Sequence, residues 1–167
     1  MTHDIEVGGE EDRLDAARIG GRAHFADVRL IRSAVTLDHF PNPDLELSYN
    51  LSMQPSIEYD EGHTHFVVRT SYVIEIFQTS EPDDDESTED VADVFATLDF
   101  EYGGLFFLPP NDPPTTSELE AFARTTGTFA LYPHAREYTN STTSRMGIPP
   151  LTLDLLRIDL PTPSQSD

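Results

Sequence analysis

The sequence predicts an α+β fold with a four-stranded antiparallel sheet and helices on one of its faces. Residues 24–108 alternate between apolar and polar side chains, which is the period of β-strands. Residues 115–147 carry helix signals instead. Strands that come first and helices that follow are typical of an α+β domain whose helices gather on one side of the sheet.

The composition limits the kinds of partner. At 167 residues, a single domain with a sizeable core is expected. All ten basic residues are Arg, and 31 acidic residues give a net charge of -21. This charge disfavours binding to nucleic acids and to anionic membranes, which require a positive surface. It favours basic partners and solubility, or it reflects an acidic bias shared by a whole proteome.

Local composition predicts the domain boundaries. Residues 1–23 are expected to form an acidic N-terminal extension that is disordered at its start. A short helix is expected at 11–23, although the Gly-Gly pair within it weakens this prediction. Residues 24–160 are expected to form the main domain, and residues 161–167 are expected to form a short C-terminal tail. The chain has no Cys, no apolar run that could span a bilayer and no signal-peptide pattern, so a cytoplasmic location is expected.

The first strand changes phase along its length. Its apolar side chains fall on even positions at Val28 and Leu30, but on odd positions at Val35 and Leu37. This change predicts a β-bulge near residues 31–34, because one extra residue reverses the two faces.

Two further strands alternate clearly. Residues 45–59 carry apolar side chains on odd positions, which predicts one half-buried strand, or two strands separated near Pro55. The next strand, at 65–77, places one apolar set on one face: Phe66, Val68, Tyr72, Ile74 and Ile76.

The last strand follows a loop at 81–90 in which seven of ten residues are acidic. The loop lacks the EF-hand calcium pattern, so a solvated hairpin loop is favoured over a calcium site. The strand is expected to face inward with Val94, Ala96, Leu98, Phe100 and Tyr102, and outward with Thr97, Asp99 and Glu101. Four strands with short polar connections predict an antiparallel meander with one covered face.

Residues 115–147 predict two helical segments. Ser, Thr and Glu at the start are placed for an N-cap. Pro133 fits a first turn or a kink, and it is expected to mark where a short helix from Ser117 gives way to the main helix. Gly147 is expected to end the helix, and Pro149–Pro150 to redirect the chain.

Motifs for catalysis and metal binding are sparse. The chain has no G-x-S-x-G, P-loop, G-x-G-x-x-G or H-E-x-x-H pattern. His63 and His65 share one face at a strand start and would need Asp60 and Glu61 to form a metal site, so two exposed histidines are favoured. His134 is interpreted as part of a helix-surface charge cluster rather than of an acid–base pair. No enzymatic activity, metal or cofactor is therefore expected.

Three stretches resemble the SecB family of protein-export chaperones. "LYPHARE" at 131–137 resembles the family's Leu-Phe-Pro-Tyr-Ala-Arg-Glu, and "GIPPLTL" at 147–153 resembles its Gly-x-Phe-Pro-Pro-Leu-x-Leu. "EYGGLF" at 101–106 is similar to the Gly-Gly that ends the last strand of that family. The order of strands, helix and diproline agrees over residues 25–153.

The resemblance implies a fold, an activity and an assembly. A long helix would pack on one face of the four-stranded antiparallel sheet, and two dimers would form a homotetramer. The activity would be ATP-independent holding of unfolded chains in apolar grooves. The candidate client-binding residues are Phe40, Leu45, Leu47, Tyr49, Leu51, Met53, Leu151, Leu153, Leu155 and Leu156. The candidate residues for docking the motor SecA are Asp38, Asp99 and Glu101, for which an ordinary polar face is the alternative. The candidate interface residues of the helix are Tyr138, Thr139, Thr142 and Arg145.

The chain also departs from export SecB. His134 and Ile148 replace aromatic residues of the signature, and "DLLRIDLPTPSQSD" after Leu153 leaves the final helix short or missing. The N-terminal extension and the acidic loop are more similar to the SecB-like chaperones of toxin–antitoxin–chaperone modules, which guard an antitoxin. The favoured hypothesis is such a holdase, or a solitary SecB-like protein. A non-chaperone binding module with this fold, and an enzyme, are the alternatives.

Overall fold

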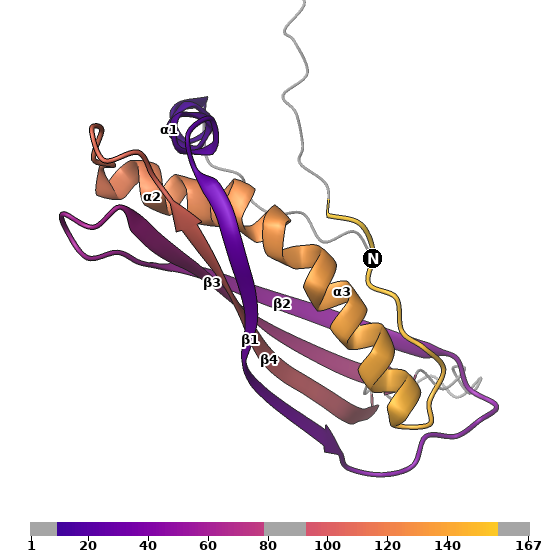
Figure 1. Ribbon diagram of the computed structural model, residues 1–167. Coiled ribbons are helices and arrows are strands. Elements are labelled where there is room, and N and C mark those ends of the chain that lie inside the picture. The colour runs from indigo at the N-terminus through magenta and orange to yellow at the C-terminus, as the bar shows by residue number, and fades with distance from the viewer. Residues whose placement is uncertain (1–9, 79–92, 157–167) are drawn as a thin grey trace, which may run out of the picture.

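The computed structural model describes residues 10–78 and 93–156 and shows an α+β architecture (Figure 1). The antiparallel strands form one sheet, and the helices lie on one side of it. The strands are β1 (His24–Leu37), β2 (Leu47–Glu58), β3 (His65–Gln78) and β4 (Asp93–Phe107). The helices are α1 (Glu10–Gly20), α2 (Thr116–Phe122) and α3 (Thr128–Arg145). The expected N-terminal disorder, the acidic loop at 81–90 and the C-terminal tail lie outside the described residues.

The strand order is β1-β4-β3-β2, so the predicted meander is wrong at one step. β2, β3 and β4 are neighbours in sequence order, but β1 pairs with β4, with His24 opposite Phe107 and Leu37 opposite Ala96. The connection after β1 therefore leads to the opposite edge of the sheet, where β2 lies. Alternation predicts which side chains face inward, but it carries no information on which strands are neighbours.

Register shifts occur in β1 and in β4. The pairing of β1 with β4 skips Ile31, which confirms the bulge predicted near residues 31–34. The pairing of β3 with β4 skips Phe95, so that Val94 lies opposite Phe77 on the outer face. The predicted inward position of Val94 is therefore wrong, because the extra residue places Phe95 in the core instead, where it is fully buried.

β2 is one strand rather than two. Pro55 lies inside it, opposite Thr70 of β3. A proline has no N–H to give to a sheet, but β2 is an edge strand, so Pro55 is tolerated there.

The core lies between the sheet and the helices and forms two clusters. Under α3, the inner faces of β3 and β4 pack against Tyr132. Near the other end of the helical layer, Phe66 of β3 and Phe122 of α2 pack with Ile19 of α1. The short helix expected within residues 1–23 is thus present, and it packs into the core of the domain instead of standing apart from it.

α2 and α3 are joined by a π-helical turn at Ala123–Gly127. The predicted N-cap is confirmed, because Thr115 and Glu118 form a reciprocal capping box at the start of α2. The short helix gives way to the main one at this π turn, and not at Pro133, which lies exposed inside α3.

α3 ends in a Schellman motif at Gly147, as the sequence predicts. Gly147 has a φ of 78°, a left-handed conformation that favours glycine. Its N–H donates to the carbonyl of Ser144 at 3.2 Å, and the N–H of Ile148 donates to the carbonyl of Thr143 at 3.3 Å. The chain then turns back at Pro149–Pro150 and runs beside α3 (Figure 1).

Candidate functional site

An extended segment, residues 151–156, lies along one face of α3 after the diproline. We name this segment the strap. Four polar side chains of α3 hold it, and we name them the clasp row: Tyr132, Arg136, Asn140 and Thr143. Residues at intervals of three and four share one face of a helix, so the clasp row follows a line along which the strap lies.

The C-terminal half of α3 holds the start of the strap. The main-chain N–H of Leu151 donates to the hydroxyl of Thr143 at 2.9 Å. One turn earlier in the helix, Asn140 Nδ2 donates to Thr152 Oγ1 at 3.2 Å. These two bonds fix the direction in which the chain leaves the diproline.

Further along the strap, side chains from both α3 and β2 hold its main chain. Arg136 Nε donates to the carbonyl of Leu153 at 2.8 Å. The hydroxyl of Tyr132 donates to the carbonyl of Asp154 at 2.6 Å, and the N–H of Asp154 donates to the hydroxyl of Tyr49 at 3.0 Å. The strap therefore bridges the helix and the edge strand.

Burial keeps the two tyrosine hydroxyls of this bridge protonated. Desolvation is the main cause that raises the pKa of Tyr132 to about 12, and it also raises the pKa of Tyr49. The Tyr132 hydroxyl therefore remains a hydrogen-bond donor to the strap at alkaline pH values near 10, where an exposed tyrosine ionises.

Most of the predicted client-binding residues come together along β2 and the strap. The half-buried ones at the margin of the core are Leu47, Tyr49, Met53, Leu151 and Leu156. Leu45 is also half-buried, whereas Phe40 and Leu155 are 88% and 67% exposed. Leu51 and Leu153 depart from the expectation, because their side chains are buried in the core. They support this surface from below and are not accessible to a client.

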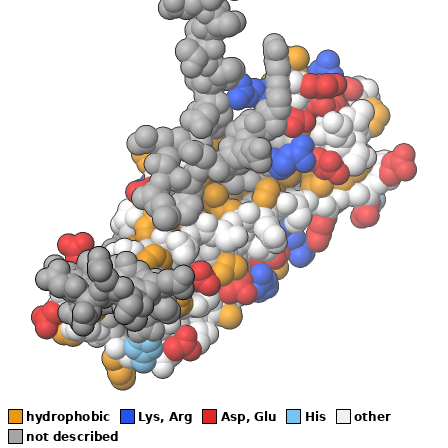
Figure 2. All heavy atoms as spheres, turned by 180° about the vertical axis from the view of Figure 1, so that it is seen from behind, with side chains coloured by type: hydrophobic (Ala, Val, Ile, Leu, Met, Phe, Trp, Pro, Cys, Tyr) orange, Lys and Arg blue, Asp and Glu red, His pale blue; other side chains and the backbone are white. Residues whose placement is uncertain are grey.

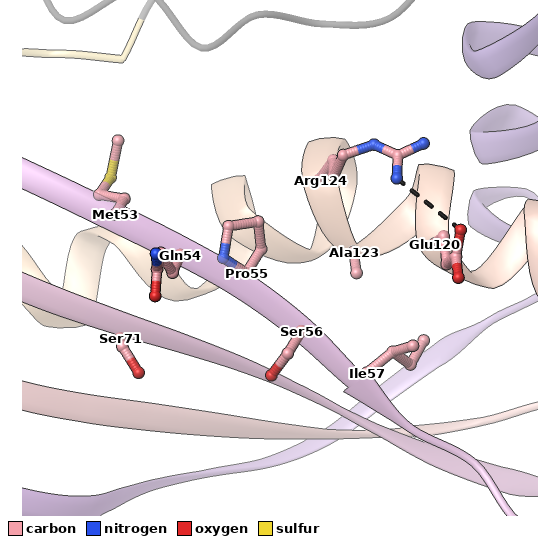
Figure 3. A pocket seen from close by; sticks show the side chains of 9 residues that line it. All are labelled: Met53, Gln54, Pro55, Ser56, Ile57, Ser71, Glu120, Ala123 and Arg124. Atoms are coloured by element: carbon pink, nitrogen blue, oxygen red, sulfur yellow. Dashed lines mark ion pairs between the residues drawn. The ribbon is translucent and has the colours of Figure 1, made fainter.

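An open pocket of about 760 Å³ lies at the edge of β2 (Figure 3). Met53 and Pro55 point toward the helical side of the strand, and Gln54 and Ser56 point away from it. The opposite wall is helical and includes Ala123. The pocket thus combines apolar side chains with the outer edge of a strand, which suits an extended peptide.

The outer face of the sheet carries two of the predicted docking acids, and arginines from neighbouring strands pair with both. Arg32 of β1 lies 2.7 Å from Asp99 and 3.5 Å from Glu101. Arg69 of β3 lies 3.3 Å from Glu101. Asp38, just after β1, is exposed. Acidic and arginine side chains also lie close to one another in the view from behind (Figure 2), and such pairing offsets the charge that a docking partner would recognise.

The helix residues predicted for an oligomer interface differ in exposure. Tyr138 and Thr142 are half-buried, and Arg145 is exposed. Thr139 is fully buried, and its hydroxyl donates to the carbonyl of Ala135 at 2.8 Å. Thr139 therefore belongs to the packing of α3 on the sheet, and it is not available to a second subunit.

β1 leaves apolar side chains uncovered on the face that carries the helices. Leu30, Val35 and Leu37 are 43%, 43% and 37% exposed. α3 reaches β1 through a hydrogen bond between the hydroxyls of Tyr138 and Ser33. β1 is also an edge strand, and an uncovered apolar face beside a free edge is typical of an interaction surface.

The histidines considered as ligands or acids lie in ordinary packing contacts. The rings of His63 and His65 stack with centroids 5.2 Å apart, and His134 packs 5.9 Å from the ring of Tyr102. Within residues 10–78 and 93–156, no three potential ligands gather to hold a metal ion. No helix in this described part has the length and apolar character needed to cross a membrane.

The sequence and the fold resemble those of known proteins. The chain is 38% identical over 162 residues to the SecB-like chaperone Rv1957 of Mycobacterium tuberculosis (strain ATCC 25618 / H37Rv), covering 91% of this chain and 90% of the relative. The SecB-like chaperone MT2006 of M. tuberculosis (strain CDC 1551 / Oshkosh) is 38% identical over the same length. No protein-family model matches the chain.

A solved structure supports the same relation. Rv1957 in complex with a ChAD peptide from the Rv1956 HigA1 antitoxin matches with a TM-score of 0.74 and 37% identity, covering 87% of this chain and 99% of that chain. The four-stranded antiparallel sheet with a long C-terminal helix on one face matches the fold of this SecB-like chaperone. The chain belongs to the family of SecB-like chaperones.

Proposed function

We propose that the chain is an ATP-independent chaperone that holds unfolded or aggregation-prone polypeptides on its apolar surface. The observation that carries the proposal is its similarity to SecB-like chaperones over 91% of its length. The net charge of -21 supports it, because repulsion between like-charged molecules limits self-association of a protein that exposes apolar side chains.

One client of the chain is an antitoxin, so the chaperone serves a toxin–antitoxin pair. Support comes from the relative Rv1957, whose solved structure contains a peptide from the HigA1 antitoxin. The client would lie extended beside β2, where the strand edge and the pocket near Met53 offer main-chain and apolar contacts. The residues proposed to contact it are Phe40, Leu45, Leu47, Tyr49, Met53, Leu151, Leu155 and Leu156.

The proposal includes assembly into a homotetramer, as a dimer of dimers. The uncovered apolar face of β1, with Leu30, Val35 and Leu37, supports it. Burial of such a face against a second copy removes apolar surface from water. The accessible residues of α3 that would join the interface are Tyr138, Thr142 and Arg145.

Coupling to protein export is the less supported alternative. Docking of SecA through Asp38, Asp99 and Glu101 would compete with the arginine pairs that already hold two of these acids. The cytoplasmic location and the lack of enzymatic activity are further parts of the proposal. The other alternative is a binding module that has the same fold but no chaperone activity. Such a module would not prevent the aggregation of an unfolded protein.

Aggregation of the insulin B chain tests the proposal. Dithiothreitol reduces the disulfides of insulin, and the released B chain aggregates. The reagent does not alter the chaperone, because the chaperone has no cysteine. Without ATP, a near-stoichiometric amount of the chaperone is expected to suppress the light scattering. Serum albumin at the same mass concentration is the control for crowding. Unchanged scattering in an excess of the chain would contradict the chaperone function and favour the non-chaperone module.

A further inference from the structure

The strap occupies a site that recognises an extended main chain. Contacts from α3 reach main-chain atoms at Leu151, Leu153 and Asp154, and Tyr49 adds one from β2. Main-chain donors and acceptors are the same in every peptide. These contacts therefore select an extended conformation and not the particular sequence of the strap.

The side-chain requirement of this site is an apolar residue at alternate positions. Leu151 is half-buried and Leu153 fully buried against the core under α3, while Thr152 between them is exposed. Successive side chains of an extended chain point to opposite sides. Any segment with an apolar–polar–apolar pattern can therefore supply what the strap supplies.

Because of the clasp row, replacement of the strap by another peptide costs less free energy than release of the strap alone. If the strap left, the Tyr132 hydroxyl and the Arg136 guanidinium would lose the carbonyl acceptors of Asp154 and Leu153. A partly buried donor without an acceptor costs free energy. An incoming extended peptide restores these bonds, because it brings carbonyl groups of its own.

We propose that the strap is an internal ligand, and that an extended segment of a client replaces it on the clasp row. The inference rests on the proposed chaperone function and adds the clasp row, once the strap has left it, to the surface beside β2 that holds the client. The free energy of strap release is subtracted from the affinity for the client. The chaperone therefore holds segments that fit the site better than Leu151–Asp154 and rejects those that fit it less well.

A reversible disulfide tests the proposal. The side chains of Asn140 and Thr152 are in contact, with Nδ2 3.2 Å from Oγ1, so the double variant Asn140→Cys/Thr152→Cys is designed to join the strap to α3 through a disulfide. The natural chain has no cysteine, so no other thiol competes, and the wild type serves as the control for the oxidant. The probe is ribonuclease A that is reduced and alkylated with iodoacetamide, which leaves it unfolded without changing its charge at neutral pH.

The oxidised double variant is expected to bind the probe at least about tenfold more weakly than its reduced form. Mass spectrometry verifies the disulfide. In a second variant, Leu153→Ala loosens the strap but leaves the clasp row and β2 intact, so it should bind the probe more tightly than the wild type.

Two results would overturn the inference, namely equal affinity in both redox states or weaker binding by Leu153→Ala. Failure of the wild type to bind the unfolded probe is a separate result. It would overturn the proposed chaperone function itself, and the inference with it.

Discussion

Replacement of Leu153 by Ala tests whether the strap is part of the folded core. The Leu153 side chain has no exposed area and packs in the cluster under α3. Leu155, two residues further along the same strap, is 67% exposed. Leu155→Ala is therefore a matched control that changes the same residue type in the same segment.

The decrease in unfolding free energy expected for Leu153→Ala follows from the burial of the leucine side chain. The change removes three carbon atoms from the core, which is about 2.4 kcal/mol at about 0.8 kcal/mol each. If the cavity stayed unfilled, the decrease in unfolding free energy would be larger, within the ~2–5 kcal/mol observed when buried leucines are replaced by alanine. Since the strap lies outside the helices and strands and can move into the space, we expect about 2–3 kcal/mol. The control should change by less than about 0.5 kcal/mol.

Urea unfolding followed by circular dichroism measures both variants. All samples are kept at one protein concentration, because the proposed assembly would make the stability depend on it. In thermal unfolding, the same loss corresponds to a decrease of about 5–10 °C in Tm. If both variants unfold at the same urea concentration, the packing of the strap described above is wrong.

Four other changes probe different parts of the molecule. Tyr72→Phe is expected to leave the unfolding free energy measured in urea unchanged, or to raise it by about 1 kcal/mol, because the buried Tyr72 hydroxyl has no hydrogen bond of normal geometry among the described residues. A clear decrease in the unfolding free energy would show that this hydroxyl has a hydrogen-bond partner. Gly104→Ala is expected to cost about 1–3 kcal/mol in thermal unfolding, since its Cβ would lie 2.9 Å from a methyl group of Leu131. The control Gly21→Ala, with 3.4 Å to the nearest atom, should cost less. Val35→Asp is expected to give a smaller species in size-exclusion chromatography with light scattering, because it places a charge on the proposed interface; an unchanged mass would exclude β1 from the assembly. The unfolding free energy is expected to fall as the pH rises from about 10 to about 12, because tyrosinate forms near pH 10 in the unfolded chain whereas burial raises the pKa of Tyr132 to about 12. Tyr132→Phe should show a smaller fall, and an identical pH dependence would contradict this cause.

Local alternation was sufficient to predict the inner face of β3 but not the neighbour of β1. The predicted inward residues of β3 are all buried in the structure: Phe66, Val68, Tyr72, Ile74 and Ile76. The pairing of β1 with β4 joins residues as far apart as His24 and Phe107, and nothing in the local pattern of either strand indicates it. The arginine–acid pairs of the outer face depend on the same register, so the sequence could not reveal them.

The clasp row is not among the predicted site residues, although its members recur at the helical intervals of three and four. Polar side chains at Tyr132, Arg136, Asn140 and Thr143 share one helical face, which was a readable signal. Nothing in the local pattern of α3 indicates a partner for that face, because the return of the chain along α3 depends on the turn at Gly147 and the diproline. Thr139 and Thr142 are predicted at a subunit interface, whereas their neighbours Asn140 and Thr143 hold the strap.

The most direct test of the chaperone function compares two states of one polypeptide. Binding of ribonuclease A to the chain is measured by isothermal titration calorimetry without nucleotide, once in its native form and once reduced and alkylated with iodoacetamide. The two forms share one sequence and nearly the same charge, so attraction to a chain with a net charge of -21 is common to both. A chaperone that holds unfolded chains is expected to bind the unfolded form more tightly than the native one, by the contribution that charge attraction does not supply. Equal binding of the two forms, or binding of neither, would contradict the account.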